Sequence, residues 1–297
     1  MLLFGAAHAT PLERFQYSEL HMGVRVNVTL YAKSTEQAET AAKAAFARFA
    51  ELEAIMSDYR DDSELMRLCA KAGTGPIKVS TELFDILQRS LKLSEETAGA
   101  FDVTCGPVVK LWRQARQNTR LPDKKTLEHA LSLVGFQHMK LDQKQSTVTL
   151  ELPGMMIDLG GIAKGYACDE ALKAMRKHGI ESAMIEAGGD IAVSNPPPNK
   201  IGWEIAVRNI DGTLFLLKNS GISTSGDTEQ FVEIDGVRYS HIVDPRTGIG
   251  LTNRVQVTVV ASDATTSDSL ATALCVLGED AGISKKYGGR AYFVKSR

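Results

Sequence analysis

The stretch Met156-Ile157-Asp158-Leu159-Gly160-Gly161-Ile162-Ala163-Lys164-Gly165 leads from an apolar strand end through a glycine turn into a helix. The first turn of a helix carries unpaired backbone N–H groups and partial positive charge, so it favours anions. Lys164 is electrostatically misplaced there unless a negative group lies nearby, which hints at a bound phosphate. The spacing matches neither the dinucleotide-binding nor the P-loop fingerprint. Taken alone, the stretch is explained as well by a tight turn with a solvated lysine.

Upstream of this stretch, the pattern is mainly helical. Residues 24–31 alternate apolar and polar side chains, as a half-buried strand does. A capping-box-like start at residues 34–37 precedes apolar positions that recur every three or four residues as far as Met56, which predicts a long amphipathic helix. Two further helices are expected, one following Ser80 and one over residues 122–135. These segments make a helical N-terminal half.

After residue 145 the pattern changes to strands. Two helices interrupt them, at residues 162–178 and about 266–277, and a glycine closes each helix. Strands clustered apart from helices indicate an α+β fold with a mixed or antiparallel sheet, and we expect any break between closely packed subdomains near residue 145. The strand-like runs are residues 147–152, 182–186, 203–208, 213–217 and 254–261.

Length and composition exclude several classes of protein. The chain has 297 residues, of which 43% are hydrophobic and 24% charged, as in a folded globular protein of one large or two modest domains. A net charge of -2 without long single-sign runs argues against a nucleic-acid surface. No apolar stretch is long enough for a membrane helix. The four cysteines lack zinc-ligand spacing, so we expect buried reduced thiols, although spacing leaves disulfides open.

The N-terminus carries a possible export signal. A short apolar run ends in an Ala-x-Ala pattern at residues 7–9, which resembles the end of a secretory signal, but a basic start is missing. A chance apolar terminus is the alternative. We expect residues 1–19 to be a signal remnant or a flexible terminus, and the protein to be periplasmic or otherwise exported rather than cytoplasmic. N-terminal sequencing of the mature protein tests this.

A possible cation site lies on the helix expected near residue 270. Asp268 and Thr272 are four residues apart and share one helix face. A carboxylate and a hydroxyl can hold a hard cation, and magnesium suits so sparse a set because water and substrate phosphate complete its shell. The alternative is structural: Thr266 or Ser267 caps the helix, and Asp268 interacts with the helix dipole.

His241 is a candidate general base. It belongs to a strand expected at residues 239–243, before a turn over residues 244–248. An imidazole beside a loop can reach a substrate and titrates near neutral pH, although a structural histidine is the alternative. Glycine-rich segments at residues 186–190 and 223–227 predict turns that let a ligand approach the backbone, and hairpin geometry explains them equally.

Together and in this order, these segments resemble the ApbE family of magnesium-dependent FAD:protein FMN transferases. The resemblance runs from about residue 20 to the C-terminus, and the number and order of individually weak motifs carry it. It implies one flavin transferase domain over residues 20–297 with an ApbE-like, T-fold-like architecture. The matching segments are residues 22–23, 56–59, 63–65, 100–104, 158–165, 186–190, 224–227, 240–248 and 268–272.

In this family an enzyme binds FAD with its diphosphate on a magnesium ion and transfers the FMN moiety to a threonine or serine hydroxyl of an acceptor protein, releasing AMP. The resemblance implies that His241 is the catalytic base. It implies FAD contacts from Met22, Tyr59, Ala100, Phe101, Asp102, Asp158, Lys164 and Ile242. For magnesium it implies the carbonyl of Gly161 and the side chains of Asp268 and Thr272, with the carbonyl of Ala271 as a further ligand.

Two other functions would use the same residues. An FAD pyrophosphatase would transfer FMN to water, and stoichiometric free FMN without a protein acceptor would reveal it. A flavin-binding or flavin-storage protein would retain FAD and form no AMP in the presence of magnesium. We expect the transferase because a base, a cation face and a phosphate turn are all present, and storage requires no base.

Overall fold

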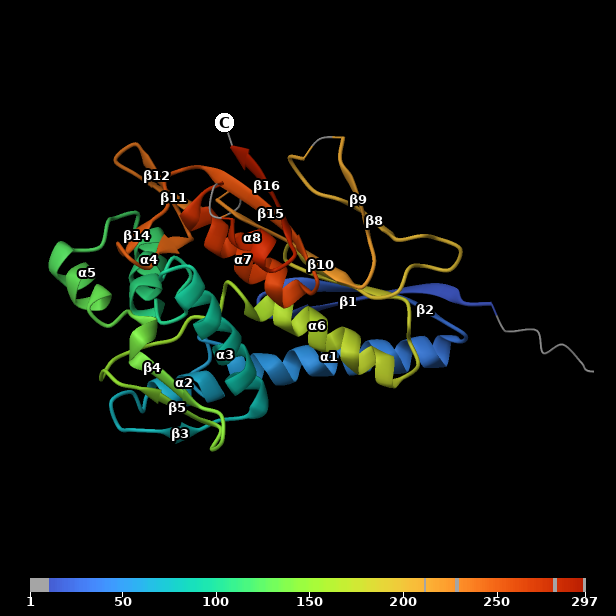
Figure 1. Ribbon diagram of the computed structural model, residues 1–297, viewed down its shortest axis with the longest axis horizontal. Coiled ribbons are helices and arrows are strands. Elements are labelled where there is room, and N and C mark those ends of the chain that lie inside the picture. The colour runs from blue at the N-terminus through green and yellow to red at the C-terminus, as the bar shows by residue number, and fades with distance from the viewer. Residues whose placement is uncertain (1–10, 211, 228–229, 280–281, 296–297) are drawn as a thin grey trace, which may run out of the picture.

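A seven-stranded antiparallel sheet organises the protein in its computed structural model, which describes residues 11–210, 212–227, 230–279 and 282–295 (Figure 1). The signal pattern expected at residues 7–9 lies outside the described residues. In spatial order the strands are β1 (Glu13–His21), β2 (Val24–Ala32), β6 (Ala183–Ala187), β7 (Asp190–Val193), β10 (Ser220–Gly226), β15 (Val255–Ala261) and β16 (Arg290–Lys295). Each strand runs antiparallel to its neighbours.

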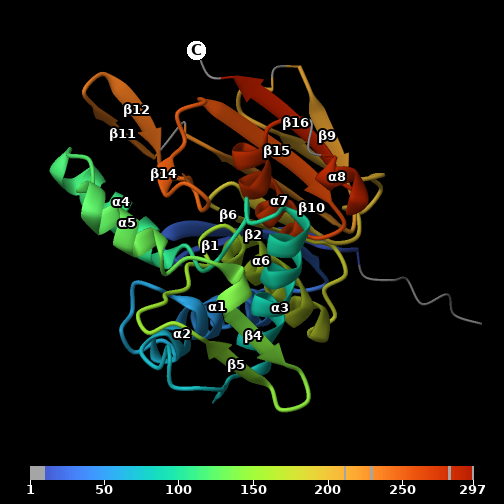
Figure 2. The same ribbon diagram turned by 60° about the vertical axis from the view of Figure 1, so that its left-hand side comes forward.

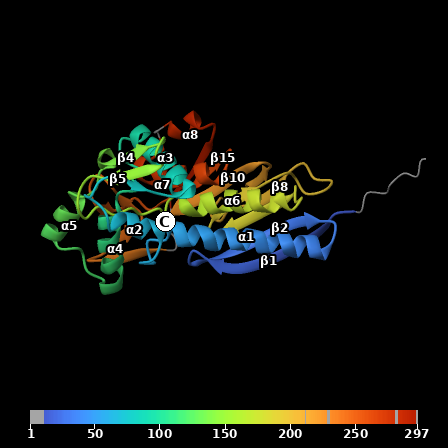
Figure 3. The ribbon, with the colours of Figure 1, turned by 90° about the horizontal axis from the view of Figure 1, so that it is seen from below.

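Three helices pack on this sheet: α1 (Thr35–Met56), α6 (Ala163–Lys177) and α7 (Ala264–Leu277). α1 contacts β1 and β2, α6 contacts β6 and β7, and α7 contacts β10 and β15. α1 and α6 lie side by side along the length of the molecule (Figures 1 and 3). The α+β class expected from the sequence is confirmed.

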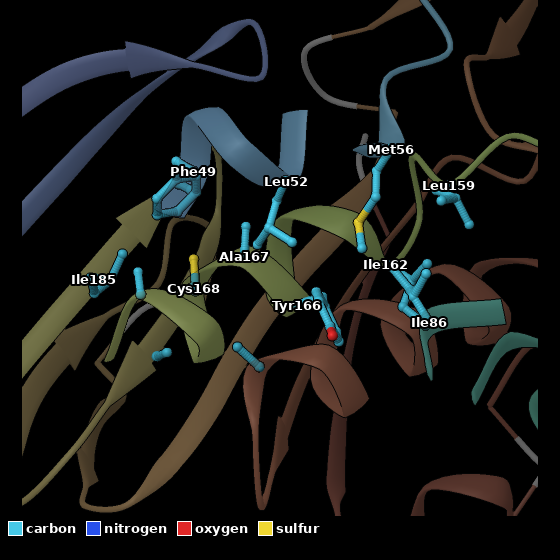
Figure 4. Packing of buried hydrophobic residues seen from close by; sticks show 14 of the residues in the cluster. Phe49, Leu52, Met56, Ile86, Leu159, Ile162, Tyr166, Ala167, Cys168 and Ile185 are labelled. Carbon is cyan, nitrogen blue, oxygen red and sulfur yellow. The ribbon is translucent and has the colours of Figure 1, made fainter. Parts of the chain in front are cut away.

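The apolar face of α1 predicted from the sequence is buried against α6. Ser34 Oγ accepts a hydrogen bond from Gln37 N at 3.2 Å and caps the start of α1, as expected. Phe49, Leu52 and Met56 point from α1 toward α6 (Figure 4). Burying one such side chain contributes about 1.5–3 kcal/mol, so this apolar face is the main reason that α1 is helical.

α6 and α7 approach one another without an intervening side chain. A Cβ at Gly165 of α6 would lie 2.2 Å from the carbonyl oxygen of Ala264, and a Cβ at Gly221 of β10 would lie 2.3 Å from the nitrogen of the same residue. Only glycine allows this approach. The cap of α7 is Asp263, whose Oδ1 accepts from Thr266 N at 2.8 Å, so the expected cap at residues 266–267 is wrong by several residues.

The first strand of the sheet corrects one expectation. Residues 13–19, expected to be a signal remnant or flexible, belong to β1, which pairs with β2 from Glu13↔Ala32 to His21↔Val24. β1 lies at the edge of the sheet, and its side chains are mostly exposed and polar. Phe15 and Tyr17 pack toward the core, which is too short an alternation to indicate a strand by itself.

A small three-stranded sheet lies below the helices, in the order β3 (Ile77–Lys78), β5 (Thr147–Leu150) and β4 (Met139–Asp142). Residue 145, where a subdomain break was expected, lies in the turn between β4 and β5. Because β3 pairs with β5, a boundary at this position would divide the sheet. The helices around it are α2 (Glu64–Cys69), α3 (Thr81–Glu96) and η1 (Phe136–His138), whereas the short α5 (Lys124–Leu131) packs against the helix over residues 106–118.

A satellite core forms between α4 (Gly106–Asn118) and two short hairpins, β11 (Phe231–Ile234) with β12 (Val237–Ser240) and β13 (Val243–Asp244) with β14 (Ile249–Gly250). Trp112 of α4 is buried in it, and its Nε1–H donates to the carbonyl oxygen of Gly248 at 2.8 Å. The centres of the Trp112 and Tyr239 rings are 5.1 Å apart. Figure 2 shows the hairpin β11–β12 standing away from the seven-stranded sheet.

The remaining elements are the hairpin of β8 (Trp203–Ala206) with β9 (Leu214–Leu217) and the short helix α8 (Ile283–Lys286). Across the part of the chain that the structure describes, no helix has the length and apolarity needed to cross a membrane. All four cysteines are free thiols, and Cys69, Cys168 and Cys275 are buried, as expected of small apolar side chains.

Candidate active site

The glycine turn before α6 and the middle of α7 meet in space. Gly165 N donates a hydrogen bond to Asp268 Oδ2 at 3.0 Å. The backbone of Gly161 lies against Thr272, because a Cβ at position 161 would be 3.0 Å from Thr272 Oγ1. The two stretches that the sequence singled out separately therefore form one site.

Lys164 lies between two carboxylates in this site. Its Nζ is 3.1 Å from Asp190 Oδ2 and 3.9 Å from Asp268 Oδ2, and it also donates to the carbonyl oxygen of Gly160 at 3.3 Å. Burial alone would lower the pKa of Lys164, but the two carboxylates raise it above its ordinary value. The negative charge that the sequence requires near Lys164 is thus supplied by the chain itself. We call Lys164, Asp190 and Asp268 the lysine cluster.

The carboxylates of the lysine cluster are almost completely buried, with side chains 3% exposed in Asp190 and 2% exposed in Asp268. Burial and the charge of Asp190 raise the pKa of Asp268 to about 7, while Lys164 opposes the shift. Asp190 Oδ2 pairs with the ammonium and has no further hydrogen-bond partner among the described residues. Two buried carboxylates against one ammonium leave the cluster with an excess of negative charge.

The predicted magnesium ligands supply oxygen donors only. Thr272 lies one helical turn after Asp268, and its Oγ1 is 3.2 Å from Ser225 Oγ. Ala271 precedes Thr272 and is buried. Among the described residues, no three His, Cys, Asp or Glu side chains group as a metal site. One carboxylate, one hydroxyl and backbone carbonyls beside an excess of negative charge fit magnesium, which keeps several of its ligands as water or phosphate.

A second charged group lies on the opposite side of the glycine turn. Asp158 Oδ1 accepts from Gly160 N at 2.7 Å, and Asp158 Oδ2 accepts from Arg113 Nη2 at 2.7 Å. Arg113 Nη1 donates to Asp58 Oδ2 at 2.5 Å, and the guanidinium carbon lies 4.2 Å from the centre of the Tyr59 ring. The predicted FAD contacts Tyr59 and Asp158 are therefore joined through Arg113. We call Arg113, Asp58, Asp158 and Tyr59 the arginine cluster.

Charges within the arginine cluster shift the pKa of Asp58. Burial and the neighbouring Asp158 carboxylate raise the pKa of Asp58 to about 6, and Arg113 opposes this. Tyr59 is 76% exposed, so its ring is open to a ligand from solvent.

The segment over residues 100–102 contributes backbone rather than side chains. Ala100 and Phe101 are buried, and both oxygens of Asp102 are used: Oδ1 accepts from Thr104 N at 2.8 Å and Oδ2 accepts from Phe136 N at 2.8 Å. Burial raises the pKa of Asp102. The segment lies beside Asp158, whose nitrogen donates to the carbonyl oxygen of residue 103 at 2.8 Å. A ligand beside Asp158 would meet the backbone of this loop.

Met22 lies in the turn between β1 and β2 with a positive φ of 50°. A Cβ at Gly188 would lie 2.9 Å from Val24, so this turn is next to the Gly188–Gly189 turn that leads into Asp190. Both glycines have positive φ, as a two-residue hairpin turn requires, which confirms the hairpin interpretation of this segment. The other glycine-rich segment is not a turn, since residues 223–226 are part of β10.

His241 follows β12, and both its backbone nitrogen and its ring contact the carbonyl oxygen of Gln230. His241 N and Nδ1 each lie 3.1 Å from the carbonyl oxygen of Gln230, so Nδ1 carries the proton and Nε2 is left as an acceptor. Burial lowers the pKa of His241, the bond to Gln230 opposes this, and the charges of Arg116 and Lys164 lower the pKa further. The ring is therefore neutral near pH 7, as a base must be.

The expected strand over residues 239–243 is interrupted at His241. β12 ends at Ser240, whose Oγ accepts from Ile242 N at 3.0 Å, and β13 begins at Val243. This break places His241 between the β11–β12 and β13–β14 pairings rather than within either of them. Ile242 itself is buried beside it.

Residues 22–286 match the ApbE family. The chain belongs to this family. An FAD:protein FMN transferase from Treponema pallidum (strain Nichols) is 33% identical over 288 residues, which cover 90% of this chain and 80% of that protein. One from Vibrio cholerae serotype O1 is 36% identical over 239 residues, 77% of this chain and 71% of that protein. A solved variant of the flavin transferase ApbE from Vibrio cholerae has a TM-score of 0.85 at 31% identity, over 96% of this chain and 94% of that chain.

Membership of the ApbE family makes this chain an enzyme with the α+β fold of that family. Four charged residues of its site were missed from the sequence. Asp58 and Asp190 lie inside segments that carried the resemblance, so their position was a usable signal. Arg113 and Arg116 lie one turn apart on α4, where no pattern marks them. Arg116 Nη1 is buried and has no hydrogen-bond partner within the described ranges.

Proposed function

We propose that this ApbE family enzyme transfers the FMN moiety of FAD to a threonine or serine hydroxyl of an acceptor protein, with magnesium, and releases AMP. The family membership and the names of its relatives support flavin transfer. The observation that carries the proposal is the meeting of the Gly161–Gly165 turn with Asp268 and Thr272 of α7. An acidic, oxygen-rich cluster of side chains at a helix start suits a cation together with a phosphate.

In this reaction His241 removes the proton from the acceptor hydroxyl. Its Nδ1–H is held by the carbonyl oxygen of Gln230, so Nε2 is the atom that takes the proton. General-base catalysis contributes roughly a hundredfold to ten-thousandfold in rate. The variant His241→Ala should therefore bind FAD and transfer it at least about a hundredfold more slowly. Transfer at the parental rate would contradict this role.

FAD lies, in this proposal, across both charged clusters. Tyr59 offers an open aromatic face and Asp158 an oriented carboxylate. Lys164 and the first backbone N–H groups of α6 offer positive charge to the diphosphate. The remaining proposed contacts are Met22, Ala100, Phe101, Asp102 and Ile242.

Asp268, Thr272 and the carbonyls of Gly161 and Ala271 would hold magnesium. When bound, the ion would neutralise charge that develops on the diphosphate oxygens as the linkage breaks. The chain itself contributes the buried carboxylate of Asp268 and the close packing of Gly161 on Thr272, which keep these donors in one place.

One experiment separates the three functions that these residues allow. The protein is incubated with FAD, magnesium and an acceptor protein that carries a flavinylation threonine, and covalent flavin, free FMN and AMP are measured. A fluorescent band that survives denaturation, with AMP in equal amount, supports the transferase. Equal amounts of free FMN and AMP without the band indicate a pyrophosphatase, and retained FAD without AMP indicates storage; either result overturns the proposal.

We also propose that the enzyme acts after export from the cytoplasm. The support is the Ala-x-Ala pattern at residues 7–9, which follows a short apolar run. N-terminal sequencing of the protein recovered from cells tests this, since cleavage after residue 9 is expected. Recovery of the protein with residues 1–9 intact in the cytoplasm would contradict it.

A further inference from the structure

Arg113 is the only residue in the arginine cluster that touches the other three. One Nη atom contacts Asp58 and the other contacts Asp158, at 2.5 and 2.7 Å. The guanidinium lies over the Tyr59 ring, with its carbon 4.2 Å from the ring centre. A guanidinium suits this arrangement because it is planar, donates in two directions and stacks on aromatic rings, whereas an ammonium is a point charge.

Arg113 supplies contacts that its partners do not obtain from their own turns. Asp158 is held at Oδ1 by Gly160 N and at Oδ2 by Arg113. Burial first and the Asp158 charge second raise the pKa of Asp58, and the guanidinium contacts both carboxylates. Tyr59 is mostly exposed, and within its own turn its backbone nitrogen donates to Ser57 Oγ at 3.2 Å. That bond involves the backbone alone, whereas the cation–π contact with Arg113 involves the ring and favours one ring direction.

We propose that Arg113 is a positioning residue, which holds the Asp158 carboxylate and the Tyr59 ring in the orientation that receives FAD. This inference rests on the proposed function, specifically on Asp158 and Tyr59 as FAD contacts. Arg113 touches both contacts and belongs to neither the cation site nor the base. Its loss should weaken FAD binding while leaving the chemical step nearly intact.

Arg48 provides a matched control outside the site. It also joins carboxylates from different elements, with Nη2 2.9 Å from Glu82 Oε1 and 3.0 Å from Glu170 Oε2, and its Nη1 lies 3.1 Å from a third, Glu51 Oε2. Its side chain is 18% exposed, compared with 23% for Arg113. The variants Arg48→Gln and Arg113→Gln should therefore lose similar packing and ion pairing, but only Arg113→Gln should affect FAD.

The test measures the FAD dissociation constant by quenching of flavin fluorescence, together with KM and kcat for transfer. Arg113→Gln should raise the dissociation constant and KM roughly tenfold to a hundredfold and change kcat much less. Arg113→Lys, which keeps the charge but not the fork, should fall between this variant and the parent. Arg48→Gln should match the parent in both constants.

A double-mutant cycle with Tyr59→Leu separates positioning from a general loss of stability. If Arg113 acts through the ring, Arg113→Gln should weaken FAD binding less in the Tyr59→Leu background than in the parent. Equal effects in both backgrounds, or parental FAD affinity in folded Arg113→Gln, would overturn the inference. If Arg113→Gln does not fold, Arg113→Lys with parental FAD affinity would overturn it in the same way.

Failure of the proposed function gives a different result. A parent protein that neither binds FAD nor modifies an acceptor would overturn both the function and the role of Arg113. A parent protein that transfers FMN normally, with Arg113 variants indistinguishable from it, would overturn only the role of Arg113.

Discussion

The lysine cluster and the arginine cluster share one plan, a cation between two carboxylates, but they differ in the shape of the cation and in burial. Lys164 is a point charge that lies 3.1 Å from one carboxylate and 3.9 Å from the other. Arg113 is a fork that contacts one carboxylate with each Nη atom, at 2.5 and 2.7 Å. The carboxylates around the lysine are also the more deeply buried pair.

This difference assigns different work to the two clusters. One ammonium faces two buried carboxylates, so negative charge is left unbalanced when both carboxylates are ionised. The lysine cluster therefore retains capacity for a second cation. The fork of Arg113 meets both of its carboxylates directly, so the arginine cluster orients groups rather than attracting a further cation.

The largest expected effect is the loss of the anionic donor in the lysine cluster. Asp268→Asn should lower the rate of covalent flavin transfer at least about a hundredfold, because the cation and the developing phosphate charge both lose stabilisation. In-gel flavin fluorescence over a series of magnesium concentrations measures this. Asp169→Asn is the control, since Asp169 is a partly buried carboxylate that serves the start of α7 by accepting from Ala264 N and Thr265 N. A parental magnesium response in Asp268→Asn would refute the assignment.

Replacing Lys164 or Arg113 by a neutral residue compares how much each side chain contributes to the free energy of unfolding. Lys164→Met should destabilise the protein by about 3 kcal/mol, because it leaves two deeply buried carboxylates without a cation. Arg113→Gln should cost only about 1–2 kcal/mol, since its carboxylates are more exposed and Gln keeps some hydrogen bonding. Urea unfolding without magnesium gives both values. The reverse order would contradict the difference in burial between the clusters.

The pH profile of transfer tests whether the positive charge of Arg116 lowers the pKa of His241. Because burial and the charge of Arg116 lower the pKa of His241, the rate should rise with pH only in the acidic range and be level near pH 7. Arg116→Gln should raise this pKa and move the acidic limb to higher pH. Rates at saturating FAD and magnesium measure the shift. Arg120→Gln, beyond the end of α4, should leave the limb in place, and an unmoved limb in Arg116→Gln would disprove the coupling.

The last comparison between the clusters is the pH dependence of stability. Folding raises the pKa of Asp58 from 3.8 to about 6 and that of Asp268 from 3.8 to about 7, so the folded state binds more protons than the unfolded state in these ranges. Stability without magnesium should therefore fall as pH rises through each range, by up to about 1.4 kcal/mol per pH unit for each group. Thermal unfolding in EDTA measures this. Asp268→Asn should reduce the slope between about pH 4 and 7, and Asp58→Asn only between about pH 4 and 6; an unchanged slope in either variant would contradict the assignment.

The contrast between the clusters also explains what could be predicted from the sequence. Lys164 was found because a lysine in the first turn of a helix is conspicuous, and Asp268 because its spacing to Thr272 places both on one face. Arg113 contacts partners 55 and 45 residues away in the sequence, so its role depends on where α4 lies in the folded chain. No local pattern encodes that position.

The fold shows the same division. The long apolar repeat of α1 and the alternation of β2 predict those elements because burial determines them. β1 was missed because its pairing with β2, rather than its own apolar face, defines it as a strand. β10 was taken in part for a turn because its small polar side chains bond to neighbouring elements, as Ser223 Oγ does to Ser267 Oγ at 2.8 Å.

The satellite core around Trp112 gives the protein a modular construction. His241 follows a hairpin that rests on α4, whereas the lysine cluster lies between α6, α7 and the large sheet. The hairpin before His241 therefore rests on a different apolar cluster from the elements that carry the lysine cluster. Substitutions that loosen the packing around Trp112 should displace this hairpin and leave the lysine cluster in place.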